Sequence, residues 1–323
     1  MIINQLKARL LRKHNLILFM TLLIGSCSSF NKRGNIKNSN VDFNKMWNYS
    51  NPVETRGKFT DLLEKDLKKD LDYILQLRTQ IARTHSLKAE FSEAHKILDI
   101  VEKELDDSTV VAKVRYLLER GRTYNSAGNK EKAKELFEKA FDLSNKYKLD
   151  NYTIDAAHMV AIAAGDLDEK VRWSEKGIQI AKDSADESVK RWIGIFYNNS
   201  GWDLFEVKRY TEALEKFIKC EEFHLEMKNE SNLAIARWSI AKTYRYLGRV
   251  EESLAIQNEL LHESGDKDDS GHTYEELAEL YLLKGEKEKA KHYFLKTHKI
   301  LSKDVWLQKN ESDRLERISR LAK

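Results

Sequence analysis

The chain shows three successive patterns of apolar and polar residues. Residues 16–24 form a continuous apolar run, residues 28–58 are polar and contain the sole proline, and from Phe59 onward apolar residues recur at helical spacing. The apolar run is about half of the roughly 20 residues that a helix needs to cross a bilayer. The pattern therefore predicts a short apolar segment, a flexible tether and then an all-α region.

The helical region repeats. Its clearest unit is residues 117–143, LLERGRTYNSAGNKEKAKELFEKAFDL, in which small residues alternate with aromatic ones. Two antiparallel helices approach closely only where small residues face each other, which accounts for Gly121 opposite Ala133 and Ala140. Tyr124 and Phe137 are expected to fill the space beside that crossing, since protein interiors are closely packed. The unit is thus predicted to be a helical hairpin.

The same offsets recur along the chain with an average step of about 39 residues. The anchor positions in the first helices are Ala82, Gly121, His158, Gly201, Ala241 and Ala278. The residues twelve places later are Ala94, Ala133, Lys170, Ala213, Ser253 and Ala290. Five of these six are small, so six hairpins are predicted over residues 59–302, with residues 303–323 as a capping helix. A coiled coil is disfavoured, because helix-crossing glycines and this step do not suit a heptad seam.

These offsets resemble the tetratricopeptide repeat. The resemblance implies an α-solenoid in which the first helix of each hairpin lines a concave groove where ligands bind. The long period is similar to repeats of the kinesin light chain type and of the peptide-sensing regulators of Gram-positive bacteria. The string Tyr197-Asn198-Asn199-Ser200-Gly201 resembles the paired asparagines of the former.

The N-terminal residues have the pattern of a targeting segment. Four basic residues precede the apolar run, which ends in Leu23-Ile24-Gly25-Ser26-Cys27. This arrangement resembles a bacterial lipoprotein signal peptide. It implies that residues 1–26 are removed, that Cys27 is acylated, and that residues 27–58 tether the array to the cell envelope, at the outer membrane if the source is Gram-negative. The alternative is an ordinary secretory signal in which Cys27 is incidental.

The net charge of +4 comes from the basic residues of this N-terminal segment. Lys7, Arg9, Arg12 and Lys13 of the signal account for all of it, and the six basic and two acidic residues of the tether leave the array near −4. The basic balance therefore gives no support for a nucleic-acid partner.

The resemblance places a set of side chains in the groove. The candidate partner-binding residues are Asn125, Asn198, Trp202, Phe205, Trp238, Lys242, Arg245 and Tyr246, and Arg83, Arg115 and Arg122 are expected to line the groove as well. Amides can pair with a peptide backbone, and cations can capture carboxylates. The aromatic residues lie in adjacent units and suit a peptide with an acidic group. The alternative is that they pack between units and that the cations form a solvated face.

No motif indicates catalysis, a metal or a cofactor. Residues 266–271 open like a calcium loop, but Leu277 stands where the bidentate Glu should be, which favours a helix-capping turn. Cys220 is expected to be buried near a helix crossing, where it fills space and does not act as a nucleophile. The sequence favours a membrane-anchored, non-catalytic scaffold for a protein or peptide; the alternative is a ligand-sensing or carbohydrate-binding lipoprotein that uses the aromatic patch.

Overall fold

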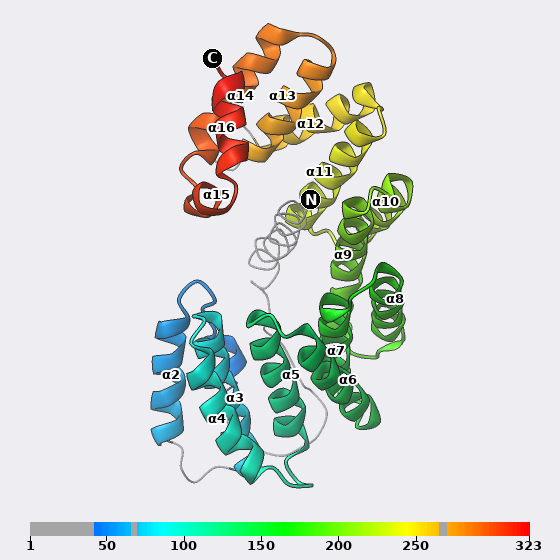
Figure 1. The fold of residues 1–323 in the computed structure, drawn as a ribbon. Coiled ribbons are helices and arrows are strands. Elements are labelled where there is room, and N and C mark those ends of the chain that lie inside the picture. Colours follow the sequence, from blue (N-terminus) through cyan, green and yellow to red (C-terminus); the bar gives the residue numbers. More distant parts are fainter. Residues whose placement is uncertain (1–41, 66–69, 265–269) are drawn as a thin grey trace. The chain divides into compact units, whose positions relative to one another are not determined.

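The computed structural model describes residues 42–65, 70–264 and 270–323, and these residues form α-helices and short 3-10 turns with no strand (Figure 1). The predicted signal peptide and Cys27 lie outside the described residues, as does most of the loop 266–271. The helices preceding and forming the hairpins are α2 (Pro52–Lys65), α3 (Leu71–Leu87), α4 (Phe91–Glu104), α5 (Val110–Ser126), α6 (Lys130–Lys146), α7 (Asp150–Ala163), α8 (Leu167–Asp183), α9 (Trp192–Glu206), α10 (Tyr210–Glu226), α11 (Glu230–Tyr246), α12 (Val250–Ser264), α13 (Gly271–Leu283) and α14 (Lys287–Leu301). They are followed by α15 (Val305–Asn310) and α16 (Ser312–Leu321), and the 3-10 turns are η1 (Phe43–Met46) and η2 (Glu187–Val189).

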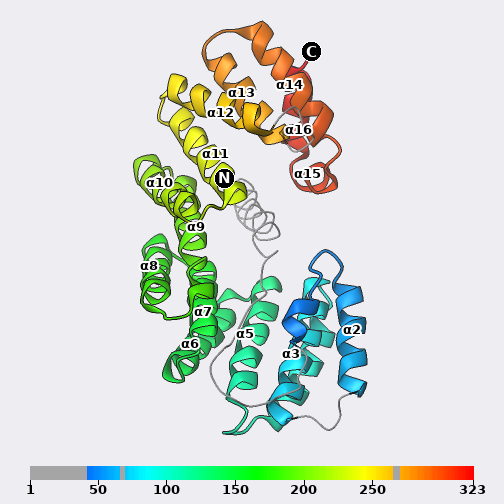
Figure 2. The ribbon, with the colours of Figure 1, turned by 180° about the vertical axis from the view of Figure 1, so that it is seen from behind.

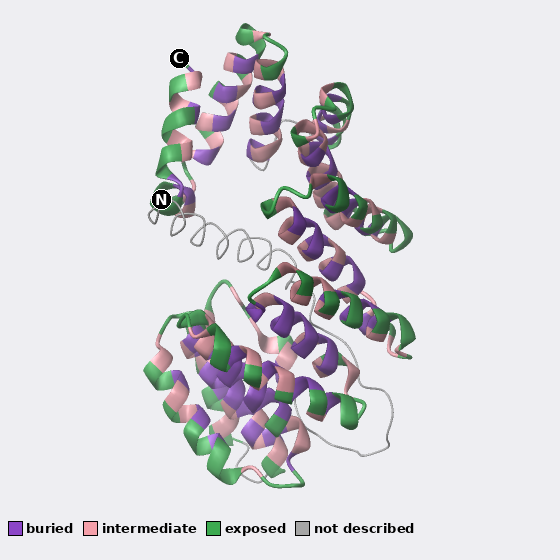
Figure 3. Cartoon of the chain, turned by 45° about the vertical axis from the view of Figure 1, so that its right-hand side comes forward, coloured by how far each residue is buried: buried purple, intermediate pink, exposed green. Residues whose placement is uncertain are grey.

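The predicted α-solenoid of six helical hairpins is confirmed, from α3–α4 to α13–α14. The five small residues predicted at the helix crossings are buried, and so are three aromatic residues of the second helices that lie beside them. Those aromatic residues are Phe137, Phe217 and Phe294. Figure 3 shows the buried positions gathered on the helix faces that meet. In the fifth hairpin the Ser253 hydroxyl also donates to the Ala241 carbonyl at 2.6 Å, which ties the two helices together.

The chain divides into two compact units between Phe196 and Tyr197, inside α9. The first unit contains η1, the helices α2 to α8 and the beginning of α9; the second contains the rest of α9 and the helices α10 to α16 (Figures 1 and 2). Each unit has its own array of hairpins.

The first helices of most hairpins end in a left-handed residue. Gly128, Gly248 and Gly285 have positive φ, and Lys208 takes the same conformation in the fourth hairpin. This conformation lets the backbone N–H groups after the helix satisfy its last carbonyls. The third hairpin differs, because α7 ends at Ala163 and the chain leaves the helix through an extended Ala164.

The folded part of the chain begins earlier than predicted. Residues 42–58 were predicted to belong to a flexible tether, but they contain η1 and the N-terminal half of α2. The reason is a local core: Phe43 and Phe59 pack with Tyr73 on α3 and are buried. Burying a large aromatic side chain favours the folded state by about 1.5–3 kcal/mol, so this segment folds back onto the array.

The C-terminal cap also differs from the single helix that was predicted. It consists of α15 and α16, which meet at Glu311. Asp304 caps α15 by accepting hydrogen bonds from the backbone N–H groups of Trp306 and Leu307. Ile318 of α16 packs against Phe294 of the last hairpin, so α16 takes the place of the next first helix.

The close helix crossing at Gly121 gives a testable consequence. A Cβ placed on Gly121 would lie 2.4 Å from Cε1 of the buried Phe137 ring. Gly121→Ala is expected to lower the free energy of unfolding by about 1–2 kcal/mol, because overpacking outweighs the gain in helix propensity. Gly57→Ala in α2 is the control, since a Cβ there meets nothing within 4 Å and should stabilise by about 0.5–1 kcal/mol. Chemical denaturation of both variants checks the difference in sign.

Candidate partner-binding faces

The structure brings four of the predicted residues together in the second unit. The Trp202 ring lies 5.2 Å from Phe205 and 6.1 Å from Trp238, centroid to centroid. Phe205 lies 4.9 Å from Tyr246, and both rings also contact Tyr210. We call these five side chains the aromatic patch. None of them is fully buried, and Tyr246 is 46 % exposed.

The two predicted cations beside this patch are engaged within the chain. Lys242 donates to Glu276 of α13 at 2.9 Å, and Arg245 donates to both oxygens of the same carboxylate at 2.7 and 3.1 Å. The Lys242 ammonium also lies 4.8 Å from the Trp238 ring centroid. A partner's carboxylate would therefore compete with Glu276 for these groups.

Glu276 is the residue that the sequence reasoning missed. Its side chain is only 2 % exposed, so burial by itself would raise its pKa, but the charges of Lys242 and Arg245 outweigh burial and lower it. The carboxylate is thus held ionised between two cations. A signal for it existed: Glu276 stands two residues before the anchor Ala278, and Glu119 stands two residues before the anchor Gly121.

The predicted asparagines lie in different units. Asn198 is buried in α9 of the second unit, and Asn125 lies near the end of α5 in the first. Within the part of the chain that the structure describes, the side-chain oxygen of each is buried and accepts no hydrogen bond. The Trp238 indole N–H is also buried and donates to no described group. The Asn198 oxygen and the Trp238 indole N–H are thus among several buried polar groups of the second unit that have no hydrogen-bond partner among the described residues.

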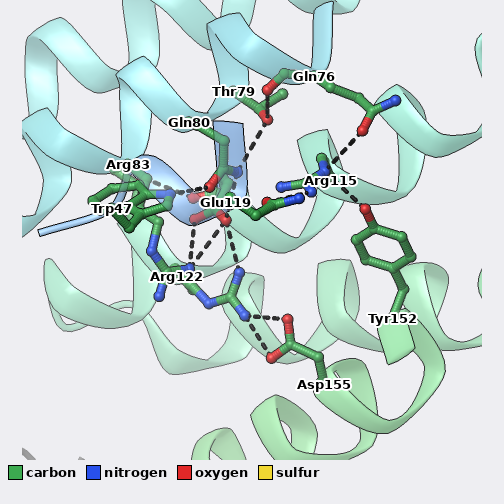
Figure 4. Close-up of polar contacts among 12 residues, drawn as sticks. Trp47, Gln76, Thr79, Gln80, Arg83, Arg115, Glu119, Arg122, Tyr152 and Asp155 are labelled. Atoms are coloured by element: carbon green, nitrogen blue, oxygen red, sulfur yellow. Dashed lines mark hydrogen bonds and ion pairs between the residues drawn. The ribbon is translucent and has the colours of Figure 1, made fainter. Parts of the chain in front are cut away.

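The first unit carries a related ion network on α3, α5 and α7 (Figure 4). Arg83 of α3 donates to Glu119 of α5 at 3.1 Å, and Arg122 donates to Glu119 at 2.9 Å and to Asp155 of α7 at 2.5–2.6 Å. Burial would raise the pKa of Asp155, but Arg122 lowers it. In both units a cation just after an anchor thus reaches an acid on the next first helix.

The N-terminal segment lies against this same face. The Trp47 indole N–H donates to the Gln80 side-chain oxygen at 3.1 Å, and Arg83 lies 5.8 Å from the Trp47 ring centroid and 5.7 Å from that of Tyr49. Arg115 donates to the Asn44 side-chain oxygen at 2.8 Å. Arg83 and Arg115, which were predicted to line a groove, are therefore covered by the chain's own residues.

The remaining features concern Cys220, metal binding and membrane-spanning helices. Cys220 is buried, and burial raises the pKa of its thiol to about 12, as befits a filler. Among the described residues, no group of three or more His, Cys, Asp and Glu side chains is arranged to hold a metal ion. No helix in the described ranges combines the length and apolarity needed to cross a membrane.

Comparison with known proteins agrees with this architecture. A family model of the tetratricopeptide repeat matches residues 114–147, within α5 and α6 and the adjoining turns. No curated protein sequence matches the chain.

Several solved structures share the fold. The apo form of RapI superposes with a TM-score of 0.67 at 14% identity, covering 81% of this chain and 76% of that one. The C-terminal part of a tetratricopeptide repeat-containing protein from Cytophaga hutchinsonii gives 0.52 at 16% identity, covering 83% and 96%. Aspartyl phosphate phosphatase F from Bacillus subtilis gives 0.54 at 12% identity, covering 89% and 87%. At these identities the likeness concerns the fold, which is a tetratricopeptide-like α-solenoid.

Proposed function

We propose that this protein is a membrane-anchored extracytoplasmic scaffold that binds a protein or peptide partner on its repeats and performs no catalysis itself. Tetratricopeptide-like repeats typically mediate protein–protein interaction. The observation that carries the proposal is the aromatic patch of the second unit, whose rings touch one another while remaining accessible to solvent. Clustered aromatic side chains of this kind are typical anchors in protein interfaces.

The patch also indicates what kind of segment it would take. The Asn198 side-chain oxygen and the Trp238 indole N–H are buried in the free chain, and they would complement the N–H and C=O groups of a peptide backbone if a partner's binding exposed them. Because Lys242 and Arg245 already pair with Glu276, the aromatic rings and amide groups supply the recognition, and an acidic residue of the partner would add to it by displacing Glu276. An extended peptide with apolar side chains fits this chemistry best.

The membrane anchor is proposed from the sequence. The basic stretch, the apolar run and Cys27 resemble a lipoprotein signal, and they place the protein on the cell envelope through an acylated Cys27. Metabolic labelling with a palmitate analogue tests this proposal, because Cys27→Ser should abolish incorporation of the label. Retention of label in that variant would show that Cys27 is not the acylation site.

The partner site is tested by substitutions that spare the core. Tyr246→Ser combined with Tyr210→Ser is expected to reduce partner recovery from crosslinked membranes at least tenfold, because it removes two accessible rings of the patch. The melting temperature should change by a few degrees at most, since surface substitutions usually change stability by less than about 0.5 kcal/mol each. Tyr147→Ser is the matched control, because Tyr147 is 47 % exposed but lies in the first unit.

The outcomes separate the proposal from its alternatives. Unchanged recovery of the partner would exclude the patch, and a large loss of stability would show that its rings mainly pack. A saccharide that quenches tryptophan fluorescence of the wild type, in the absence of a stoichiometric protein partner, would favour carbohydrate binding instead.

A further inference from the structure

The segment Phe43–Tyr49 contacts the first unit in two different ways. Phe43 is inserted into the core and is 3 % exposed, with ring contacts to Phe59 and Tyr73 at centroid distances of 6.0 and 5.4 Å. Trp47 and Tyr49 are instead only partly buried: Trp47 packs against the edge of that core, and both rings keep part of their area in solvent. The first residue is therefore a fold element, whereas the other two resemble a bound peptide.

The surface part of this contact has the chemistry of a recognition site. The Trp47 and Tyr49 rings stack on each other, with centroids 4.7 Å apart and planes 8° apart, and the Arg83 guanidinium faces both rings. Gln80 accepts the indole N–H, a bond that phenylalanine cannot form because its ring has no polar donor. Cation–π contacts and a directed hydrogen bond together select an aromatic residue, a spacer and a second aromatic residue.

The protein side of this contact is fixed independently of the segment. Arg83 is held by two bonds to Glu119, and Glu119 is held in turn by Gln80 and Arg122 (Figure 4). These bonds lie among α3 and α5 and do not involve Trp47 or Tyr49. The recognising groups are thus preorganised, which reduces the entropy cost of binding a peptide.

We propose that this face of α3 and α5 is a second peptide-binding site, specific for a Trp-x-Tyr type of sequence, and that Trp47-Asn48-Tyr49 is its resident, displaceable ligand. Trp47 also contacts Phe59 of the adjacent α2, with ring centroids 5.3 Å apart, so an aromatic occupant could replace this contact when the segment leaves. The partner that fits is a protein segment with two aromatic residues separated by one residue. Phe43 remains in the core during the exchange and keeps the chain attached.

The test is binding of a fluorescein-labelled peptide of residues 45–51, KMWNYSN, to the full chain, measured by anisotropy. The full-length Trp47→Ala/Tyr49→Ala variant has an empty site and should bind this peptide at least tenfold more tightly than the wild type does. A peptide with both aromatic residues replaced by alanine should lose that binding. A peptide with tryptophan replaced by phenylalanine should bind several-fold more weakly, because it cannot donate to Gln80.

Failure of the folded variant to bind the peptide would overturn the proposal. If the variant does not fold, hydrogen exchange of the wild type decides. The amide of Asn48, which donates to Thr55, should exchange by local opening faster than the amides of α3. Exchange of this amide only through global unfolding would show that the segment is a permanent part of the core. Because this face lies in the first unit, its failure leaves the aromatic patch of the second unit untouched.

Discussion

Glu276→Ala is expected to lower the free energy of unfolding of the second unit by about 3–5 kcal/mol. Its carboxylate is almost completely buried and bonds both Lys242 and Arg245, whose side chains are 20 % and 15 % exposed. Removing it leaves two cations close together in a partly desolvated site without a counter-charge. Urea denaturation followed by circular dichroism measures the loss.

Two matched variants show that the effect comes from the buried charge. Glu251→Ala removes a surface pair with Lys284 in the same unit, and exposed pairs contribute little to stability because water and salt screen them. Lys242→Met together with Glu276→Leu replaces part of the network with apolar groups and should recover some of the lost stability. A loss for Glu276→Ala no larger than that for Glu251→Ala would mean that Lys242 and Arg245 are readily rehydrated and free to receive a partner's carboxylate.

The folded protein is expected to lose stability between pH 7.5 and pH 5. Burial lowers the pKa of His158 to about 4, with the charges of Asp155 and Arg122 changing it less, and burial also lowers the pKa of His224 to about 4. An unfolded histidine has a pKa of about 6.5. Below that pH the histidine is therefore protonated in the unfolded chain but stays neutral in the folded chain. Each histidine then costs about 2 kcal/mol at pH 5 relative to pH 7.5.

The location of these histidines explains the shift and supplies the control. His158 lies in α7 with ring contacts to Trp192 and Phe196, at centroid distances of 5.2 and 5.9 Å, and His224 is buried in α10. His158→Leu with His224→Leu should flatten the stability profile over this pH range, whereas His292→Leu at an exposed position of α14 should leave it unchanged. A steep profile in the double variant would assign the pH dependence to other groups.

Much of the fold was predictable because the repeat is a local pattern. The helix pairs follow from the 39-residue step and from small residues opposite aromatic ones, and Gly121 against Phe137 and Gly201 against Phe217 confirm that logic in the structure. The third hairpin shows its limit. There the ring that meets a glycine comes from the following helix, since Phe196 of α9 lies against Gly177 of α8, and no fixed offset within one unit indicates this exchange.

The candidate site was predictable only in part. The sequence placed Trp202, Phe205, Trp238 and Tyr246 together, because equivalent positions on neighbouring first helices become adjacent when hairpins stack. It did not show that Lys242 and Arg245 are both paired with Glu276, since these bonds join residues more than thirty positions apart.

By itself, the sequence determined that the chain is an array of helical hairpins, because the spacing of small and aromatic residues fixes which helix faces can meet. Only the tertiary structure decided which groove residues remain accessible. Arg83 is covered by Trp47 and Tyr49, and Lys242 and Arg245 are held by Glu276, whereas the aromatic patch stays open. The physical reason is that helix periodicity is set by neighbours along the chain. The pairing of a charged side chain and its exposure to solvent depend instead on contacts with residues that are distant in sequence.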